Sequence, residues 1–178
     1  MQMKELRRVV TGIDASGKSY VAIDGPPANI READGRGAAE FWATDAMPAD
    51  NAAPGDAAER PTRLEPPAGG SVIRYLKLAP DDKALSLAEL EAQNAARFAA
   101  MGASHCRVDT SRHPSMHTTR TVDYIIVLSG RVTLLLDQGE VELKPFDVVV
   151  QRGTNHGWVN RGPEPAVMAA ILIDAKPL

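Results

Sequence analysis

The chain is poor in cysteine, in long hydrophobic runs and in any export signal. Cys106 is its single cysteine, so no disulfide can form within the chain and a reducing compartment is expected. The longest apolar run, Val167 to Ile173, is far too short to cross a membrane as a helix. No apolar segment follows the first charged residues, so the N-terminus does not resemble a signal peptide. These absences predict a cytoplasmic protein without a membrane partner.

The chain also lacks an excess of basic charge. It has 20 Lys and Arg against 23 Asp and Glu, with a net charge of -3 and no basic block, so nucleic acid is not an expected partner. The 178 residues suffice for one domain with a substantial core and are too few for two ordinary ones. A single globular domain is therefore predicted.

Short runs rich in Val, Ile, Leu and Thr dominate the segment from Met116 to Asn160. Turn sequences interrupt these runs at Ser129-Gly130, at residues 137–139 and at Arg152-Gly153. Such a pattern is typical of a β-meander or a β-barrel.

Two of the four histidines lie at the two ends of this segment. If the first end is a strand, His117, Thr119 and Asp123 point to one face, which continues into the apolar Ile125 and Val127. At the second end, alternate residues of a strand again point to one face, and these are His156, Trp158 and Asn160. If the two faces meet inside a barrel, two imidazoles and one carboxylate converge, which suits a divalent transition metal with open coordination positions.

These residues resemble the two motifs of the cupin family, G-x5-H-x-H-x3,4-E-x6-G and G-x5-P-x-G-x2-H-x3-N. The positions that match are His117, Asp123 and Gly130 in the first motif and Gly153, His156 and Asn160 in the second. The resemblance implies an all-β protein with a single jelly-roll barrel. It also implies a divalent metal (Fe, Mn, Zn or Ni) bound by His117, Asp123 and His156.

The sequence departs from the family motifs at several positions. Thr119 stands in place of the second metal-binding His, and Asp123 is a shortened form of the Glu. Ser111, Gln151 and Pro145 replace the first Gly, the Pro and the opening Gly of the motifs. A hydroxyl is a poor ligand for such a metal, so weaker metal binding is expected than for three His and a Glu.

Around this site the sequence offers further polar and aromatic residues. The candidate pocket residues are Thr119, Gln151, Trp158, Asn160 and, from the preceding loop, His113. The predicted function is action on a small oxygenated metabolite, with Asp123 as metal ligand or catalytic base, in a lyase, isomerase or dioxygenase reaction. The alternative is a non-catalytic small-molecule binder with a degenerate metal site.

Residues Gly12 to Ser19 match the phosphate-binding pattern G-x4-G-K-S letter for letter. That motif requires a helix to begin at its Lys-Ser end. The next residues, Tyr20 to Ile23, form a β-type run that ends at a turn. A β-hairpin loop is predicted here instead of a phosphate site.

More than half of the 13 prolines lie between Pro26 and Gly70. This composition predicts an irregular arm, so residues 1–70 are interpreted as a hairpin and arm that pack on the barrel or on a partner. Residues 71–178 form the barrel domain, with Ser71–Leu78 as its first full strand. The last strand, Ala166–Asp174, is apolar on both faces, which favours a homodimer.

One helix is predicted, from Leu87 to Met101. Ser86 and Glu89 form a capping box, and apolar residues then recur at helical spacing until Gly102. His105 and Cys106 follow in a loop. Since neighbouring side chains point apart, they are not expected to act together.

Overall fold

The computed structural model describes residues 2–178. Strands predominate, as predicted, and a single α-helix is present among these residues. The helical elements are η1 (Met3–Glu5), α1 (Leu87–Ala100) and η2 (Ser104–Cys106). The strands are β1 (Arg8–Ile13), β2 (Ser19–Gly25), β3 (Asn29–Ala33), β4 (Arg36–Thr44), β5 (Ser71–Leu78), β6 (Thr121–Ser129), β7 (Val132–Leu136), β8 (Glu140–Leu143), β9 (Val148–Gln151), β10 (His156–Val159) and β11 (Ala166–Asp174).

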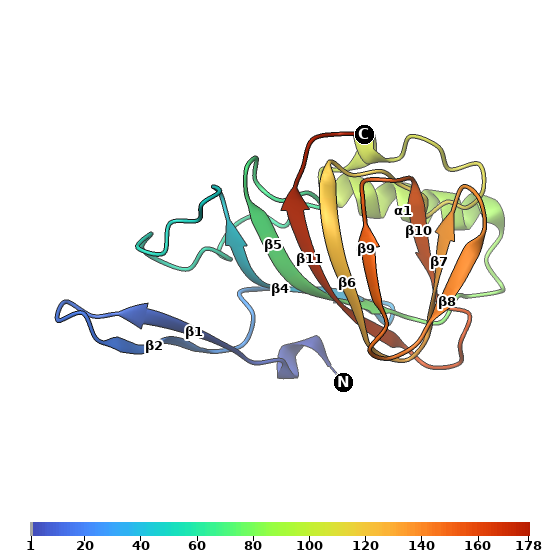
Figure 1. Ribbon diagram of the computed structural model, residues 1–178. Coiled ribbons are helices and arrows are strands. Elements are labelled where there is room, and N and C mark those ends of the chain that lie inside the picture. Colours follow the sequence, from blue (N-terminus) through green and yellow to red (C-terminus); the bar gives the residue numbers. More distant parts are fainter. Residues whose placement is uncertain (1) are drawn as a thin grey trace.

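Two antiparallel sheets face each other and form the barrel (Figure 1). The larger has the strand order β3-β4-β5-β11-β6-β9 and the smaller has the order β10-β7-β8. Alternate side chains of both sheets point inward and form one apolar core, as the period of a β-strand requires. Its members include Val72, Ile125, Val127, Leu134, Met168 and Leu172. The predicted all-β jelly-roll barrel is confirmed.

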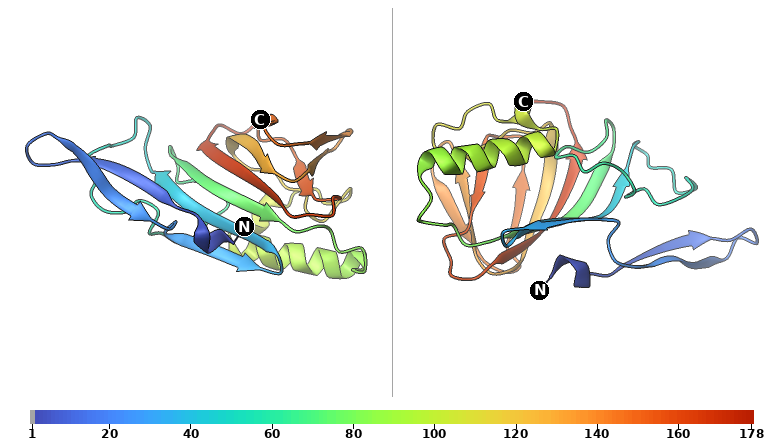
Figure 2. Two further views of the ribbon diagram at one scale, coloured as in Figure 1. Left: turned by 90° about the horizontal axis from the view of Figure 1, so that it is seen from below. Right: turned by 180° about the vertical axis from the view of Figure 1, so that it is seen from behind.

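The helix α1 lies across the open side of the barrel (Figure 2). Ser86 caps its first turn by accepting a hydrogen bond from the Glu89 amide, and the Glu89 carboxylate accepts one in return. Gly102 follows the helix with a φ of +65°, a left-handed conformation that favours glycine. Asn94 and Phe98 are the buried residues of the helix. The predicted helix is confirmed to within one residue at its end.

The first two strands form a hairpin that projects away from the barrel (Figure 1). Asp14 Oδ1 accepts hydrogen bonds from the backbone amides of Ser16 and Lys18, which closes the turn between the strands. Ser19 then begins β2, so no helix starts where a phosphate-binding loop would need one. The predicted hairpin is confirmed.

The irregular arm is shorter than predicted. Residues 29–44 within it form β3 and β4, and β4 pairs with β5, so the barrel sheet already begins at Asn29. Residues 28–47 contain no proline, and this gap in the proline distribution leaves room for two hydrogen-bonded strands. Residues 45–70 do run without helix or strand.

Candidate functional site

His117 and His156 lie directly opposite each other at the mouth of the barrel. An antiparallel backbone bridge joins them, in which each amide donates to the other residue's carbonyl oxygen, at 2.8 and 2.9 Å. Their ring centroids are 4.3 Å apart with an angle of 45° between the ring planes. Both side chains are buried. The structure therefore brings together the two histidines that the sequence predicts to meet.

Each of the two rings has its tautomer fixed in the same way. His117 Nδ1 donates to the carbonyl oxygen of Ser115 and His156 Nδ1 donates to that of Thr154, both at 2.9 Å. A neutral imidazole with its proton on Nδ1 carries its lone pair on Nε2, the usual arrangement in a metal-binding histidine. Burial lowers the pKa of both rings, that of His156 to about 3, so both are neutral at pH 7.

Aromatic side chains flank the histidine pair. The Phe98 ring of α1 lies 4.9 Å from the His117 ring, centroid to centroid, which closes one side. Trp158 on β10 meets His156 edge-on at 5.8 Å and packs against the barrel core. These apolar walls remove water from the pair and cause the loss of basicity.

Asp123 lies further along the inner face of β6. Its side chain is buried, and burial raises the pKa of the carboxyl to about 6, against the opposing effects of a hydrogen bond from Thr121 and the charge of Arg74. Thr119 in turn shares a hydrogen bond of 2.7 Å with Thr121. Asp123 Oδ1 is buried with no hydrogen-bond partner among the described residues. A carboxyl that titrates near neutrality can accept or release a proton in a reaction.

A buried ion pair, which the sequence pattern did not predict, accompanies Asp123. Arg74 on β5 lies 3.0 Å from Glu40 on β4, and each side chain is only 2% exposed. Strand β11 lies between β5 and β6, and its Ala170 pairs with Arg74 on one side and with Ile125 on the other. The residue between Arg74 and β6 is therefore a small one. Arg74 shares the parity of the buried Val72, which is the signal that could have predicted an inward guanidinium.

The two histidines and Asp123 do not form one compact ligand group. Among residues 2–178, a single set of three His, Cys, Asp or Glu side chains has its ligand atoms within 4.8 Å of one another, and that set is Glu65, His105 and Cys106. Binding of one ion by His117, Asp123 and His156 together stays a prediction, because it requires a closer approach of Asp123 than the structure has.

Gln151 lies beside Asp123, since the two are paired in the register of β6 and β9. Its amide nitrogen donates to the Thr154 carbonyl oxygen at 3.1 Å, the same oxygen that accepts the proton of His156 Nδ1. Gln151 therefore holds the turn that orients His156.

Two other predicted pocket residues make contacts of a structural kind. The Asn160 amide donates to the carbonyl oxygens of Leu78 and Glu164, at 3.0 and 2.8 Å, and joins the ends of β10 and β5. His113 Nδ1 accepts from the Ser115 amide at 3.1 Å. Burial lowers the pKa of His113. Neither residue makes a hydrogen bond or ring contact with the histidine pair.

The chemistry of these groups fits a divalent transition metal. Two buried neutral imidazoles with their lone pairs on Nε2 lie side by side, and Asp123 Oδ1, which has no hydrogen-bond partner among the described residues, is buried on the inner face of β6. Thr119, at the position of a third histidine, has its hydroxyl engaged with Thr121. The two imidazoles are therefore the candidate ligands of this site.

Comparison with known proteins points to one family. The profile described as "Cupin domain" matches residues 105–173, which include both histidines and Asp123. "Phomopsin biosynthesis cluster protein C'" of Diaporthe leptostromiformis is 30% identical over 187 residues, covering 99% of this chain and 82% of that protein. "Cupin-domain-containing oxidoreductase virC" of Hypocrea virens is 40% identical over 67 residues, 35% of this chain and 34% of that protein.

Among solved structures, a "Cupin 2 conserved barrel domain protein" from Salinispora arenicola is similar, with a TM-score of 0.44 and 18% identity, covering 83% of each chain. No helix among the described residues has the length and apolar character needed to cross a membrane.

Proposed function

The chain belongs to the cupin family, and on that premise we propose that it is a metal-dependent enzyme acting on a small oxygenated metabolite. The observation that carries the proposal is the matched geometry of His117 and His156. Both rings are buried, neutral and fixed by a backbone carbonyl on Nδ1, so that Nε2 of each is available as a ligand.

His117 and His156 hold the metal in this proposal. A bound divalent metal with open coordination positions polarises a carbonyl or carboxylate oxygen of the substrate, or supports oxidation if it is iron. Phe98 and Trp158 exclude water from the two rings. Thr154 and Ser115 keep the ring protons on Nδ1, away from the ligand nitrogens.

Asp123 is the proposed catalytic base. A pKa of about 6 keeps its carboxyl largely ionised at pH 7 yet basic enough to accept a proton. Its Oδ1 has no hydrogen-bond partner among the described residues and is the atom available to take that proton. Arg74 supplies a fixed positive charge that limits the rise of the pKa.

Among lyase, isomerase and dioxygenase reactions, the comparisons favour a reaction that changes the oxidation state of the substrate. Relatives from Hypocrea virens and Neurospora crassa carry the description "cupin-domain-containing oxidoreductase". A relative that matches 99% of this chain is named for a biosynthesis cluster, which supports a small metabolite as substrate.

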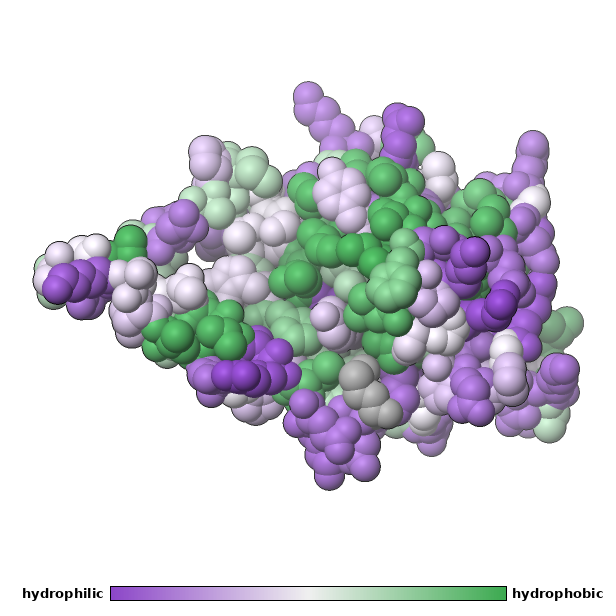
Figure 3. All heavy atoms as spheres, turned by 60° about the horizontal axis from the view of Figure 1, so that its bottom comes forward, coloured by the Kyte–Doolittle hydropathy of each residue, from purple (hydrophilic) through white to green (hydrophobic). Residues whose placement is uncertain are grey.

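We also propose that two copies of the chain associate through the outer face of the larger sheet. One row of cross-strand partners on this face is entirely apolar: Ile73, Ile171, Tyr124 and Val150, from β5, β11, β6 and β9. Figure 3 shows hydrophobic residues gathered across this sheet and a smaller hydrophobic area on the projecting hairpin. An exposed apolar surface of this continuity is typical of a protein interface.

Metal content tests the proposed function. The chelator-treated chain is reloaded with Fe, Mn, Zn or Ni in a Cys106→Ser background, which removes the chain's single thiol. About one ion per chain is expected, with loss of that ion in the His117→Ala, His156→Ala double variant and retention in the matched His113→Ala control. Equal metal in all variants would contradict the site. No metal in any of them would favour the non-catalytic binder.

A further inference from the structure

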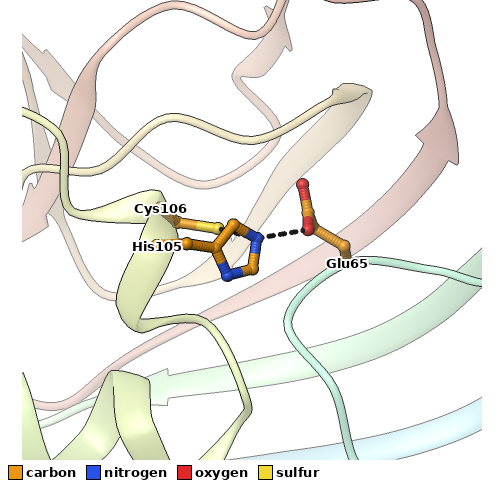
Figure 4. Close-up of side chains that lie close together, drawn as sticks. All are labelled: Glu65, His105 and Cys106. Atoms are coloured by element: carbon orange, nitrogen blue, oxygen red, sulfur yellow. Dashed lines mark hydrogen bonds and ion pairs between the residues drawn. The ribbon is translucent and has the colours of Figure 1, made fainter.

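A second group of potential metal ligands lies outside the histidine pair. Glu65, His105 and Cys106 have their ligand atoms within 4.8 Å of one another. His105 Nε2 is 3.1 Å from Glu65 Oε2 and 3.5 Å from Cys106 Sγ. Figure 4 shows the imidazole between the thiol and the carboxylate. One ring nitrogen therefore lies next to an oxygen and a sulfur at the same time.

The local backbone explains why two neighbours in sequence act together. His105 and Cys106 belong to the 3₁₀ element η2, so their side chains do not alternate between opposite faces as they would in a strand. The Cys106 amide donates to the Ala103 carbonyl, and its own carbonyl accepts from the Thr118 amide at 2.8 Å. The expectation that the two side chains point apart is wrong here for this reason.

Glu65 reaches the group from the long loop between β4 and β5. Its Oε1 accepts a hydrogen bond of 2.9 Å from the Arg120 backbone amide, just before β6. This bond fixes the carboxylate and directs Oε2 toward His105. Two distant parts of the sequence thus meet through side chains that carry oxygen, nitrogen and sulfur.

We propose that Glu65, His105 and Cys106 bind a zinc ion, with a water molecule as fourth ligand. Zinc favours thiolate, imidazole and carboxylate ligands in a tetrahedron, and bond lengths of roughly 2.3, 2.05 and 2.1 Å give ligand separations of roughly 3.6 Å for S to N and 3.4 Å for N to O. The separations of 3.5 and 3.1 Å in the structure are close to these values. As the Zn–S bond forms, the thiol proton of Cys106 passes to solvent.

The surroundings suit an ion that enters from solvent and stays. The His105 side chain is 64% exposed and gives access to the group. Cys106 is only 2% exposed and packs with Phe98 and Ala103, which protects the sulfur from oxidation. The bound ion links the loop that carries Glu65 to η2 and, through Thr118, to the segment that carries His117. Its role is to fix the mouth of the barrel.

Cobalt(II) is the probe for this site, because it occupies zinc sites and absorbs light. Cys106 is the single cysteine of the chain, so a thiolate-to-cobalt charge-transfer band can arise only there. We expect this near-ultraviolet band when cobalt is added to the chelator-treated full chain under argon, and its disappearance when zinc is added. The His117→Ala, His156→Ala double variant keeps the band, since neither residue supplies sulfur.

Variants of the group decide whether it acts as one site. Cys106→Ser abolishes the band, and Glu65→Gln and His105→Ala weaken cobalt affinity at least roughly tenfold. Ser104→Ala, an exposed neighbour on the same element, leaves affinity unchanged. No band in the wild type with cobalt in excess would overturn the proposal. A band of equal affinity in Glu65→Gln and His105→Ala would overturn it as well, and these two variants remain informative if Cys106→Ser fails to fold.

Discussion

His117 and His156 lie side by side and make the same two kinds of hydrogen bond with the backbone. Each donates its amide to the other's carbonyl, and each donates Nδ1–H to the carbonyl of the residue two positions before it. Two segments that are distant in the sequence thereby present two imidazoles in one tautomer. A metal-binding histidine usually donates its other ring N–H to an acceptor such as a backbone carbonyl, as both of these histidines do.

Gln151 is expected to tune metal affinity without touching the metal. Its amide donates to the Thr154 carbonyl oxygen that also accepts from His156 Nδ1. Gln151→Ala frees the turn, so metal affinity in the Cys106→Ser background should fall roughly tenfold. Isothermal titration calorimetry measures this change. Arg152→Ala, an exposed residue of the same turn, is the matched control, and an equal loss there would refute the role of Gln151.

The pH dependence of stability should carry the signature of Asp123. Its pKa is about 6 in the folded chain and near 3.8 in the unfolded chain, so between these values the folded state binds more protons. The free energy of unfolding of the metal-free protein should therefore decrease as pH rises from about 4 to about 6, by on the order of 2 to 3 kcal/mol from this group.

Asp123→Asn removes the titrating group at nearly constant shape. Denaturant unfolding of wild type and variant across this pH range gives the difference directly. We expect the wild type to lose stability relative to the variant as pH rises. A difference that is flat with pH would show that the Asp123 carboxyl keeps its ordinary pKa in the folded chain.

Replacing one partner of the Glu40–Arg74 pair should lower the free energy of unfolding much more than replacing both partners. Arg74→Met leaves the Glu40 carboxylate buried without a counter-charge, and a loss of about 3 to 5 kcal/mol in the free energy of unfolding is expected. Combining it with Glu40→Leu should restore most of that loss. Arg131→Met, at an ion pair whose side chains are 61% and 63% exposed, should cost about 1 kcal/mol or less. Similar losses for Arg74→Met and Arg131→Met would contradict the buried character of the first pair.

Tyr124 tests the proposed association of two copies. It is 43% exposed in the middle of the apolar row on the outer sheet face. The wild type should sediment as a dimer in analytical ultracentrifugation, and Tyr124→Arg should shift it to the monomer, since a buried unpaired charge disfavours association. Val141→Arg, at a similarly exposed position on β8, should leave the dimer intact. A wild type that sediments as a monomer would exclude this interface.

The sequence predicted the barrel well because local patterns and the fold agree there. The strand Ala166–Asp174 and the capping box at Ser86 have the bounds and contacts that their residues imply. The strands β3 and β4 were missed because the composition of the whole proline-rich segment obscured a proline-free stretch inside it.

The candidate site was only partly predictable for a different reason. His117 and Asp123 are both buried, but the expected strand is shorter than predicted: β6 begins at Thr121, and His117 lies in an isolated bridge before it. The alternation of side chains along a strand does not reveal which residues lie beside it on neighbouring strands. It could not show that Asp123 pairs with Gln151 of β9 or that the charge of Arg74 acts on the Asp123 carboxyl. The meeting of Glu65 with His105 depends on a long loop whose path no local pattern specifies.

The most direct measurement is the position of the metal itself. Crystals of the metal-loaded chain, measured at the absorption edge of the bound element, locate the ion through its anomalous scattering. We expect a peak at about 2.1 Å from Nε2 of both His117 and His156. A fully loaded crystal with no peak between these imidazoles, or with its single peak beside Glu65, His105 and Cys106, would contradict the proposed metal centre.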